Sequence, residues 1–298
     1  MLTSKDFDTV AKPDWCPGCG NFGIQVAIKQ ALANLNIEPH RIAMISGIGC
    51  SSKMPHWVDT YGLHTLHGRS VPPASGVKLA NPKLTVLING GDGDGYGIGM
   101  GHFVHVMRRN IDMTYMVHNN MVYGLTKGQA TPTSAKGYKS PSTPFGAIEE
   151  PLNPIALALT MGATFIARGY AGDAPHLTKL IEEAVKHKGF SFIDIYQPCV
   201  TFNKINTYAY FLQHVYKLET DAGFDKTSFE QAMKKAWQTD KLPIGIFYQV
   251  DKPTYEEQEP GMTHTGDAAA LATEENLIPA VDLDISNIDI TKAMERYM

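Results

Sequence analysis

The sequence predicts an α/β fold, with a mainly parallel sheet, helices on both faces and an extended C-terminal tail. Short apolar runs typical of buried strands alternate along the chain with amphipathic stretches of helical period. The length of 298 residues, with 43% hydrophobic and 19% charged residues, provides an ample core for a globular domain. We expect this domain to span residues 1–250, followed by an acidic extension at 251–298.

The expected elements follow one another in alternating order. Residues 21–36 form an amphipathic helix, and strands at 42–46 and 84–89 each lead into a glycine-rich loop. A stretch rich in Gly, Pro, Ser and Thr at 124–154 is too polar for core, and a loop of this length is usually functional or disordered. Helices are expected at 97–109, 154–161, 174–187 and 228–238, and further strands at 113–118, 163–167, 190–196 and 244–250.

Charge and hydropathy exclude several classes of function. The net charge of −4 argues against nucleic acid as a general partner. An apolar leader and runs of 18 apolar residues are both absent, so we expect neither secretion nor membrane spanning, and a cytoplasmic location. Eleven acids and three bases give residues 251–298 a charge of −8, which leaves +4 on the rest. This tail is either a solvated extension or an arm along a partner subunit.

The most informative stretch runs from residue 90 to 120. Gly-Gly-Asp-Gly-Asp-Gly at 90–95 follows one predicted strand, and Asn119-Asn120 follows the next. Carboxyl ends of parallel strands meet at one edge of a sheet, where ligands bind. A carboxylate and an amide beside glycines that let a phosphate approach the backbone indicate a magnesium-bridged diphosphate.

This pattern resembles the cofactor motif of thiamine-diphosphate enzymes, in which Gly-Asp-Gly precedes Asn-Asn. Here 25 residues separate Gly93 from Asn119, which fits the motif. The resemblance implies the fold that binds the diphosphate side of thiamine. Asp94 is either a further magnesium ligand or a cap of the helix that follows, and we favour the cap.

The four cysteines form a second pattern. Cys16 and Cys19 lie in Trp-Cys-Pro-Gly-Cys, whereas Cys50 and Cys199 each follow a predicted strand. An intracellular chain disfavours structural disulfides, which leaves a redox dithiol, a zinc site, an iron–sulfur cluster or independent buried thiols. A thioredoxin-like dithiol needs a preceding strand, which is missing, and structural zinc usually takes two close pairs.

The strand ends favour a shared site. Cys50 and Cys199 follow strands in the same way as Asp92 and Asn120 do, so we expect all four residues to converge at one edge of the sheet.

Together these motifs resemble the β subunit of 2-oxoacid:ferredoxin oxidoreductases over about residues 15–255. The resemblance is carried by the segments 15–20, 48–52, 67–69, 91–95, 119–129 and the region of Cys199. It implies that Cys16, Cys19, Cys50 and Cys199 bind one [4Fe-4S] cluster beside the thiamine ring. It also implies that Asp92, Asn120 and the Val122 carbonyl bind Mg²⁺.

Further residues receive roles from the same resemblance. It implies cofactor contacts, or contacts of a loop with diphosphate or substrate, for Ile48, Gly49, Gly91, Gly93, Asp94, Leu125 and Thr126. Basic residues expected to line the cavity, and assigned to catalysis, are Lys53, His67, Arg69 and Lys127. Each has a plainer alternative, which is a surface position for Lys53, Arg69 and Lys127, and a turn cap for His67.

The implied reaction is oxidative decarboxylation of a 2-oxoacid with coenzyme A to acyl-CoA and CO₂, with electrons passing to ferredoxin. This chain has room only for the diphosphate side of thiamine. An α subunit would therefore supply the pyrimidine side and its activating glutamate, in an αβ dimer or an (αβ)₂ assembly.

The segments 67–69, 123–129 and 201–206 look most like those of subunits that act on 2-oxoglutarate. Lys53, Arg69 and Lys127 are candidates to bind its distal carboxylate. Pyruvate and branched-chain 2-oxoacids stay open as substrates. The rival functions are a non-oxidative thiamine-dependent decarboxylase and a zinc-stabilised assembly subunit without catalysis.

Overall fold

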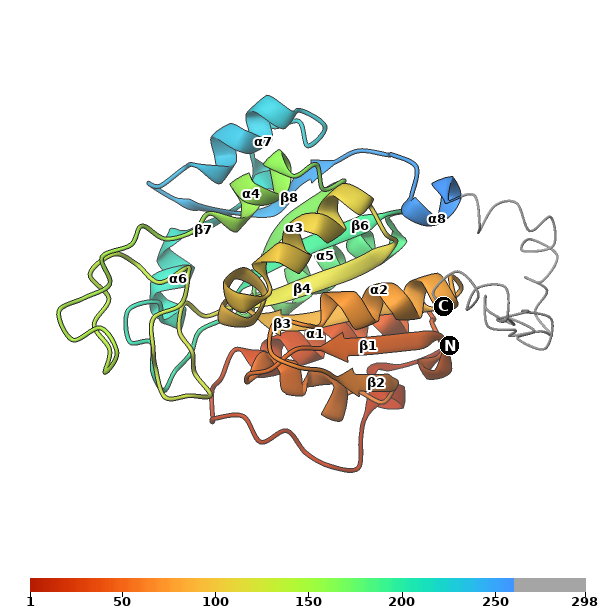
Figure 1. Ribbon diagram of the computed structural model, residues 1–298, viewed down its shortest axis with the longest axis horizontal. Helices are drawn as coiled ribbons and strands as arrows, with labels where there is room; N and C mark the ends of the chain where they lie inside the picture. Colours follow the sequence, from red (N-terminus) through yellow and green to blue (C-terminus); the bar gives the residue numbers. More distant parts are fainter. Residues whose placement is uncertain (260–298) are drawn as a thin grey trace, which may run out of the picture.

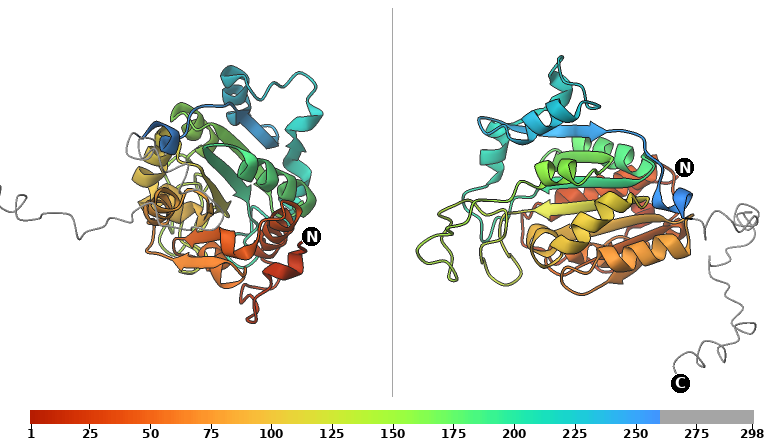
Figure 2. Two further views of the ribbon diagram at one scale, coloured as in Figure 1. Left: turned by 90° about the vertical axis from the view of Figure 1, so that its right-hand side faces the viewer. Right: turned by 45° about the horizontal axis from the view of Figure 1, so that its top comes forward.

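A twisted eight-stranded sheet runs through the protein, with helices on both of its faces (Figures 1 and 2). The structure is a computed structural model that describes residues 1–259. The strand order is β2-β1-β3-β4-β6-β5-β8-β7. The strands from β2 to β5 in this order are parallel, whereas β8 pairs antiparallel with β5. The prediction of a mainly parallel α/β fold is confirmed.

The strands are β1 (Ile42–Ser46), β2 (Tyr61–His64), β3 (Thr85–Gly91), β4 (Met113–Asn119), β5 (Phe165–Tyr170), β6 (Phe190–Tyr196), β7 (Val215–Lys217) and β8 (Leu242–Gln249). The α-helices are α1 (Asn21–Asn34), α2 (Val71–Ala80), α3 (Met100–Arg109), α4 (Pro154–Thr160), α5 (Ala174–Lys186), α6 (Tyr208–His214), α7 (Phe229–Ala236) and α8 (Tyr255–Gln258). Among residues 1–259 no helix is long and apolar enough to cross a membrane.

Two hydrophobic cores lie on opposite faces of the sheet. Side chains alternate along each strand, so that Ala43 and Ile45 of β1 join one core while Ile42 and Met44 join the other. Helices α2, α3, α4 and α7 cover the first face, which is turned towards the viewer in Figure 1, and α1 and α5 cover the second. Burial on both faces explains why the central strands read as continuous apolar runs.

The structure differs from the expected elements at several places. The helix expected at 97–109 begins at Met100, because a π-helical turn at Gly93–Ile98 precedes it. Strand β2 was missed because all four of its residues are exposed, so it lacks a buried pattern. Helix α2 was not predicted because its sequence contains two prolines and a glycine, residues that disfavour the interior of a helix. Proline is nevertheless tolerated in the first turn, where both prolines lie. The short elements α6, β7 and α8 were also not predicted.

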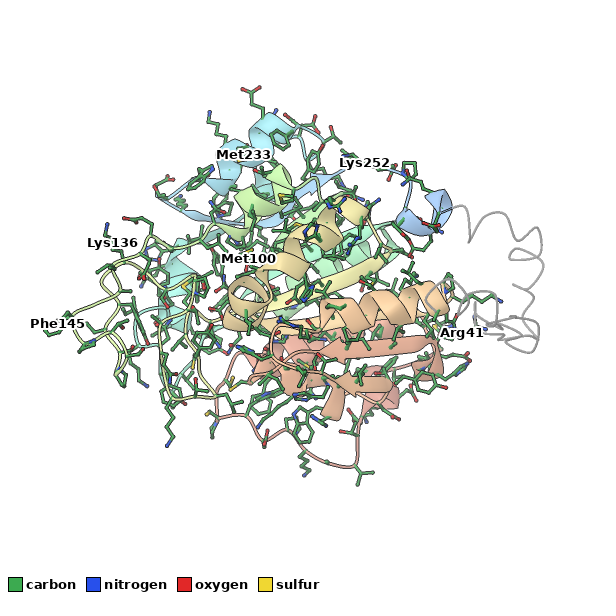
Figure 3. All side chains as sticks on the ribbon, viewed as in Figure 1. Arg41, Met100, Lys136, Phe145, Met233 and Lys252 are labelled. Carbon is green, nitrogen blue, oxygen red and sulfur yellow. The ribbon has the colours of Figure 1, made fainter. Side chains whose placement is uncertain are left out.

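The segment between β4 and α4 is only partly a surface loop. Apart from isolated bridges it contains no helix or strand, yet Thr131, Thr133 and Ser134 are buried. The expectation that this segment is too polar for core is therefore wrong at these residues, because their hydroxyls find partners inside the protein. For example, Ser134 Oγ donates to the Met121 carbonyl at 2.7 Å. At the outer side of the segment, Phe145 is fully exposed (Figure 3).

The first residues of the acidic extension lie against the domain. Asn110 Nδ2 donates to the Pro253 carbonyl at 3.1 Å, and the Asp112 amide donates to Glu256 Oε1 at 3.1 Å. Asn110 ends α3 in a left-handed conformation with φ of 54°. The predicted solvated extension or inter-subunit arm lies mostly outside the described residues.

Candidate active site

The candidate site lies at the carboxyl edge of four adjacent strands, β1, β3, β4 and β6. The chain leaves these strands towards Cys50, Asp92, Asn120 and Cys199, respectively. In Figure 1 this edge is on the left, beside the long segment that follows β4. The expected convergence of these strand ends is therefore observed, in two adjoining cavities.

The first cavity, called here the Gly-Asp-Gly cavity, has a volume of about 230 Å³. It is lined by backbone from the ends of β1 and β3 and by the loop after β4. Its lining residues include Ile48, Gly49, His67, Gly91, Asp92, Gly93, Asp94, Asn120, Val122, Leu125 and Thr126. The cavity thus brings together the residues expected to contact the cofactor.

Asp92 and Asn120 provide oxygen donors in this cavity. Asp92 is buried, and Thr133 Oγ1 donates to its Oδ2 at 2.8 Å. Burial raises the pKa of Asp92 to about 6. Asn120 Oδ1 accepts from the Val122 amide at 3.1 Å. A carboxylate, an amide and the nearby Val122 carbonyl make an all-oxygen donor set that fits Mg²⁺, and a cation would favour the ionised form of Asp92.

Asp94 connects two loops to the turn that follows β3. Its Oδ1 accepts from the amides of Ile48 (2.9 Å) and Gly68 (2.7 Å). The same oxygen lies 2.9 Å from His67 Nδ1, while Oδ2 is buried without a hydrogen-bond partner. Burial raises the pKa of Asp94. The favoured interpretation of Asp94 as a helix cap is wrong, because its side chain bonds to other loops instead of the following helix.

A network of hydrogen bonds between buried side chains fixes the position of Asp92. Thr133 Oγ1 also lies 2.9 Å from Asn119 Oδ1, and Asn119 Nδ2 donates to Asp194 Oδ1 at 3.0 Å. Arg168 Nε donates to Asp194 Oδ2 at 2.9 Å. These five side chains are all buried, so the hydrogen bonds between them fix their rotamers. Of the Asn119-Asn120 pair, only Asn120 therefore faces the cavity, while Asn119 holds the network.

The position of Gly93 has no room for a side chain, because the ring of Tyr123 lies beside it. A Cβ atom at Gly93 would lie 2.1 Å from the Tyr123 ring, whose hydroxyl donates to the Gly93 carbonyl at 3.2 Å. Any side chain at Gly93 would displace Tyr123, which also lines the cavity. The glycine therefore shapes the cavity wall, in addition to leaving room for a phosphate.

The loop after β4 holds two strained residues. Met121 has φ of 60° and Lys127 has φ of 79°, the left-handed region that favours glycine. Residues 123–129, which include Lys127, are closed into a loop by hydrogen bonds from the Tyr123 amide to the Gln129 carbonyl (2.9 Å) and from the Gly128 amide to the Tyr123 carbonyl (2.8 Å). Such strain of about 1–3 kcal/mol per residue persists where surrounding contacts impose it, and it is common at functional sites.

The second cavity, called here the cysteine cavity, has a volume of about 280 Å³ and is lined by all four cysteines. All four are free thiols. Burial raises the pKa of Cys19 to about 12, with smaller contributions from the other three cysteines. A buried thiol of this kind becomes a thiolate when it binds a metal.

Four cysteines that line one cavity form a ligand set rich in thiolates. In a [4Fe-4S] cluster each of four cysteines binds its own iron. The residues of the cysteine cavity therefore fit an iron–sulfur cluster. Within residues 1–259 no group of three Cys, His, Asp or Glu side chains forms a site for a single metal ion.

The two cavities share a wall. Cys50, Asn120, Gly124 and Leu125 line both of them. Gly124 lies directly beside the thiols, since a Cβ atom built on it would be 3.7 Å from Cys50 Sγ and 3.8 Å from Cys199 Sγ. Groups bound in the two cavities would thus be neighbours.

The predicted basic residues are distributed unevenly. Lys53 and Lys127 line the cysteine cavity, where Lys53 Nζ pairs with Asp14 at 2.8 Å. His67 lines the Gly-Asp-Gly cavity. Arg69 lies outside the lining of both cavities, and its Nη1 donates to the carbonyls of Gly68 (3.2 Å) and Ile98 (3.3 Å).

Sequence reasoning missed Thr133, Asp194 and Gln197. Gln197 directly follows β6, so the strand-end argument applied to Asp92 and Asn120 could have identified it. Thr133 belongs to a polar segment, and no pattern of the sequence marks it as buried. Asp194 is a charged residue within an apolar strand, which is a signal of an internal partner.

Comparisons with known proteins agree with this geometry. Residues 47–195 match the family described as thiamine pyrophosphate enzyme, C-terminal TPP binding domain. Residues 199–264 match the family described as the C terminal of the pyruvate ferredoxin oxidoreductase beta subunit.

Curated relatives point in the same direction. The chain is 51% identical to a 2-oxoacid:ferredoxin oxidoreductase subunit beta from Saccharolobus solfataricus, over 82% of this chain and 85% of that protein. It is 35% identical to the 2-oxoglutarate synthase subunit KorB of Methanocaldococcus jannaschii, over 82% and 90% of the two chains.

Among solved structures, the 2-oxoglutarate:ferredoxin oxidoreductase from Magnetococcus marinus, with 2-oxoglutarate, coenzyme A and succinyl-CoA bound, is similar with a TM-score of 0.85. The two chains are 38% identical, and the match covers 100% of this chain and 96% of the other.

Proposed function

This chain belongs to the β subunits of the 2-oxoacid:ferredoxin oxidoreductases, and we propose that it acts on 2-oxoglutarate with coenzyme A and passes electrons through a [4Fe-4S] cluster to ferredoxin. The observation that carries the proposal is the wall shared by the two cavities. It sets a diphosphate site and a four-cysteine site side by side, as a decarboxylation coupled to electron transfer requires.

The Gly-Asp-Gly cavity holds the cofactor in this proposal. Asp92, Asn120 and the Val122 carbonyl bind Mg²⁺ on the diphosphate, and the network behind Thr133 keeps Asp92 in position. Bound thiamine diphosphate supplies the nucleophilic carbon for attack on the 2-oxoacid, and a bound cluster removes the resulting electrons one at a time.

His67 is the proposed proton-exchanging residue. Its Nδ1 lies 2.9 Å from the buried Asp94 carboxylate, which fixes the ring orientation, and its side chain is 39% exposed and lines the cavity. Tyr123 and Leu125 line the same cavity and supply it with apolar surface.

The four cysteines hold the cluster next to this cavity. Their position selects electron removal over simple protonation, which would be the outcome in a non-oxidative decarboxylase. Lys53 and Lys127 lie at this second cavity, where positive charge stabilises an electron-rich cluster.

The names of the relatives imply an α subunit, which we propose supplies the pyrimidine side of thiamine. The lining of the Gly-Asp-Gly cavity contains neither Lys nor Arg. A distal carboxylate of 2-oxoglutarate would therefore find its cation on the α subunit or at Lys127 in the adjoining cavity. The choice of 2-oxoglutarate is supported by the KorB relatives and by the ligands bound in the Magnetococcus marinus structure.

An anaerobic assay of the assembled complex tests the proposal. We expect coenzyme A-dependent reduction of a viologen dye with a kcat/KM at least about tenfold higher for 2-oxoglutarate than for pyruvate, since each tenfold preference needs only about 1.4 kcal/mol. The isolated chain is the control and should be inactive. A preference for pyruvate or branched-chain 2-oxoacids would overturn the substrate assignment, and a colourless complex without iron would overturn the electron-transfer function.

A further inference from the structure

We propose that Gln197 is a positioning residue for both cofactor sites: its carboxamide orients Asn120 and donates an N–H to Cys19 Sγ, which raises the reduction potential of the cluster. This inference rests on the proposed function, because it takes Asn120 as a magnesium ligand and Cys19 as a cluster ligand.

Gln197 lies between the two sites. It directly follows β6, and its backbone amide donates to the Asn119 carbonyl at 3.0 Å. Its side chain is buried, with 1% of the residue exposed, and it lines the cysteine cavity. Gln197 Oε1 accepts from Asn120 Nδ2 at 2.8 Å, and Gln197 Nε2 donates to Cys19 Sγ at 3.3 Å.

Backbone groups fix the orientation of both amides. Asn120 Oδ1 accepts from the Val122 amide, which can only donate, so Asn120 must present its NH₂ group to Gln197. Gln197 therefore presents its oxygen to Asn120 and its NH₂ group to the other side. There Nε2 donates to the Pro198 carbonyl at 2.9 Å, a group that can only accept. The second N–H of Nε2 is left for Cys19 Sγ. A flipped Gln197 amide would lose the hydrogen bonds with both Asn120 and the Pro198 carbonyl.

Gly20 provides the space that Gln197 needs. A Cβ atom on Gly20 would lie 3.0 Å from Gln197 Cγ and 3.1 Å from its Nε2. The Gly20 amide also donates to the Pro198 carbonyl at 3.1 Å. The glycine at the end of Trp-Cys-Pro-Gly-Cys-Gly therefore lets the carboxamide pack closely beside Cys19.

The contact has a defined electronic consequence. An N–H that donates to a ligand sulfur stabilises the added negative charge of a reduced cluster, and so raises its potential. Loss of this donor should make the cluster harder to reduce. Loss of the acceptor at Oε1 should instead loosen Asn120 and weaken binding of Mg²⁺ and thiamine diphosphate.

The test uses Gln197→Met in the assembled complex, with a redox titration of the cluster followed by electron paramagnetic resonance. Met keeps the size of the side chain and adds no charge, but it removes all three hydrogen bonds of the carboxamide, those with Asn120, Cys19 and the Pro198 carbonyl. We expect the equilibrium for cluster reduction to fall about tenfold, which is a midpoint potential lower by about 59 mV for one electron. The matched control is Gln25→Met, since Gln25 is also buried and donates to a backbone carbonyl, that of Trp57 at 2.7 Å.

A second variant separates the two ends of the carboxamide. Gln197→Glu keeps an oxygen that accepts from Asn120 but offers no N–H to Cys19. We expect it to lower the potential at least as much as Gln197→Met, while it binds thiamine diphosphate within about threefold of the native affinity. Gln197→Met should bind about tenfold more weakly, the scale of an outer-shell loss.

The outcomes separate the two proposals. Iron analysis of the native complex comes first, because a native complex without iron refutes the proposed function itself. If the native complex holds its cluster, a midpoint potential in either Gln197 variant equal to that of Gln25→Met overturns the electronic role. Native thiamine diphosphate affinity in Gln197→Met overturns the role in orienting Asn120.

Discussion

Several hydrogen bonds fix the carboxylates of the Gly-Asp-Gly cavity, whereas fewer contacts fix the cysteines of the cysteine cavity. On the first side, Asp92 and Asp94 accept from or pair with a hydroxyl, main-chain amides and an imidazole. On the second side, Gln197 Nε2 donates to Cys19 Sγ at 3.3 Å and Trp15 Nε1 donates to the Cys50 carbonyl at 2.7 Å, while the four cysteines line open space. The comparison indicates that the hydrogen bonds of the chain itself define the first cavity more completely than the second.

The largest effects are expected from substitutions that remove the ligand of one cavity and leave the ligand of the other cavity bound. We expect Asp92→Asn to weaken binding of thiamine diphosphate and Mg²⁺ by at least about 100-fold, because a neutral amide replaces the buried carboxylate. Iron content should stay at about four per chain. We expect Cys199→Ser to reverse this pattern, with most of the iron lost and thiamine diphosphate affinity within about threefold of native.

Isothermal titration with thiamine diphosphate and iron analysis of anaerobically purified protein measure the two properties. Thr201→Ala is a suitable control, since Thr201 also lines the cysteine cavity but provides no thiol. If either substitution abolished both properties in a folded protein, the two cavities would not be independent sites, contrary to this comparison.

An intermediate effect is expected at Thr133, whose hydroxyl donates to Asp92 in the wall of the Gly-Asp-Gly cavity. Thr133→Val keeps the shape of the side chain but removes the hydroxyl between Asp92 and Asn119. We expect about tenfold weaker binding of Mg²⁺ and thiamine diphosphate, with the cluster potential unchanged. Thr133→Ser keeps the hydroxyl and serves as the control. Equal affinities of the Val and Ser variants would show that the hydroxyl contributes nothing to the site.

The smallest effect concerns His118, which is fully buried in β4. Its ring nitrogens lie 2.8 Å and 3.0 Å from the carboxamides of Asn21 and Asn89, and burial lowers its pKa to about 3. A neutral ring satisfies both contacts when it donates to the oxygen of one carboxamide and accepts from the NH₂ group of the other. Because the folded state keeps the ring neutral, the unfolded chain binds the extra proton as the pH falls below about 6.5. Stability should therefore be intact above that value and decrease on acidification towards pH 3.

Between pH 7 and pH 5 this histidine should contribute a loss of about 2 kcal/mol in the free energy of unfolding. Urea unfolding of the native chain and of His118→Gln at both pH values measures its share. The control is His40→Gln, at an exposed position. An unchanged pH dependence in His118→Gln would mean that other groups account for the acid sensitivity.

Strand ends were the part of the site that the sequence predicted well. Buried parallel strands read as apolar runs, so Cys50, Asp92, Asn120 and Cys199 could be assigned to one edge of the sheet from their places after these runs. The cavity lining then agreed for most of the expected cofactor contacts.

The remaining features depend on contacts between distant segments. Asp94 was assigned to its own helix because local patterns are all that a sequence displays, whereas its partners come from Ile48 and Gly68. Thr133 lies in a segment with neither helical nor strand periodicity, so its burial could not be read from the chain. The position of strand β8 along the sequence was predicted correctly. Its antiparallel pairing with β5 was not, because it depends on the path of the chain between these two strands and not on a local pattern.

The wall shared by the two cavities also bears on regulation. Cys50, Asn120, Gly124 and Leu125 line it, and the hydrogen bonds of the loop after β4 hold the last three in a loop with strained residues at Met121 and Lys127. In the proposed function, the spacing between thiamine diphosphate and the cluster is set by this wall, which belongs entirely to a single chain. An α subunit that moves would open or cover the cavities, but it would not lengthen this path. Control of electron flow should therefore act on the entry of substrate and carrier, while the internal transfer distance stays constant.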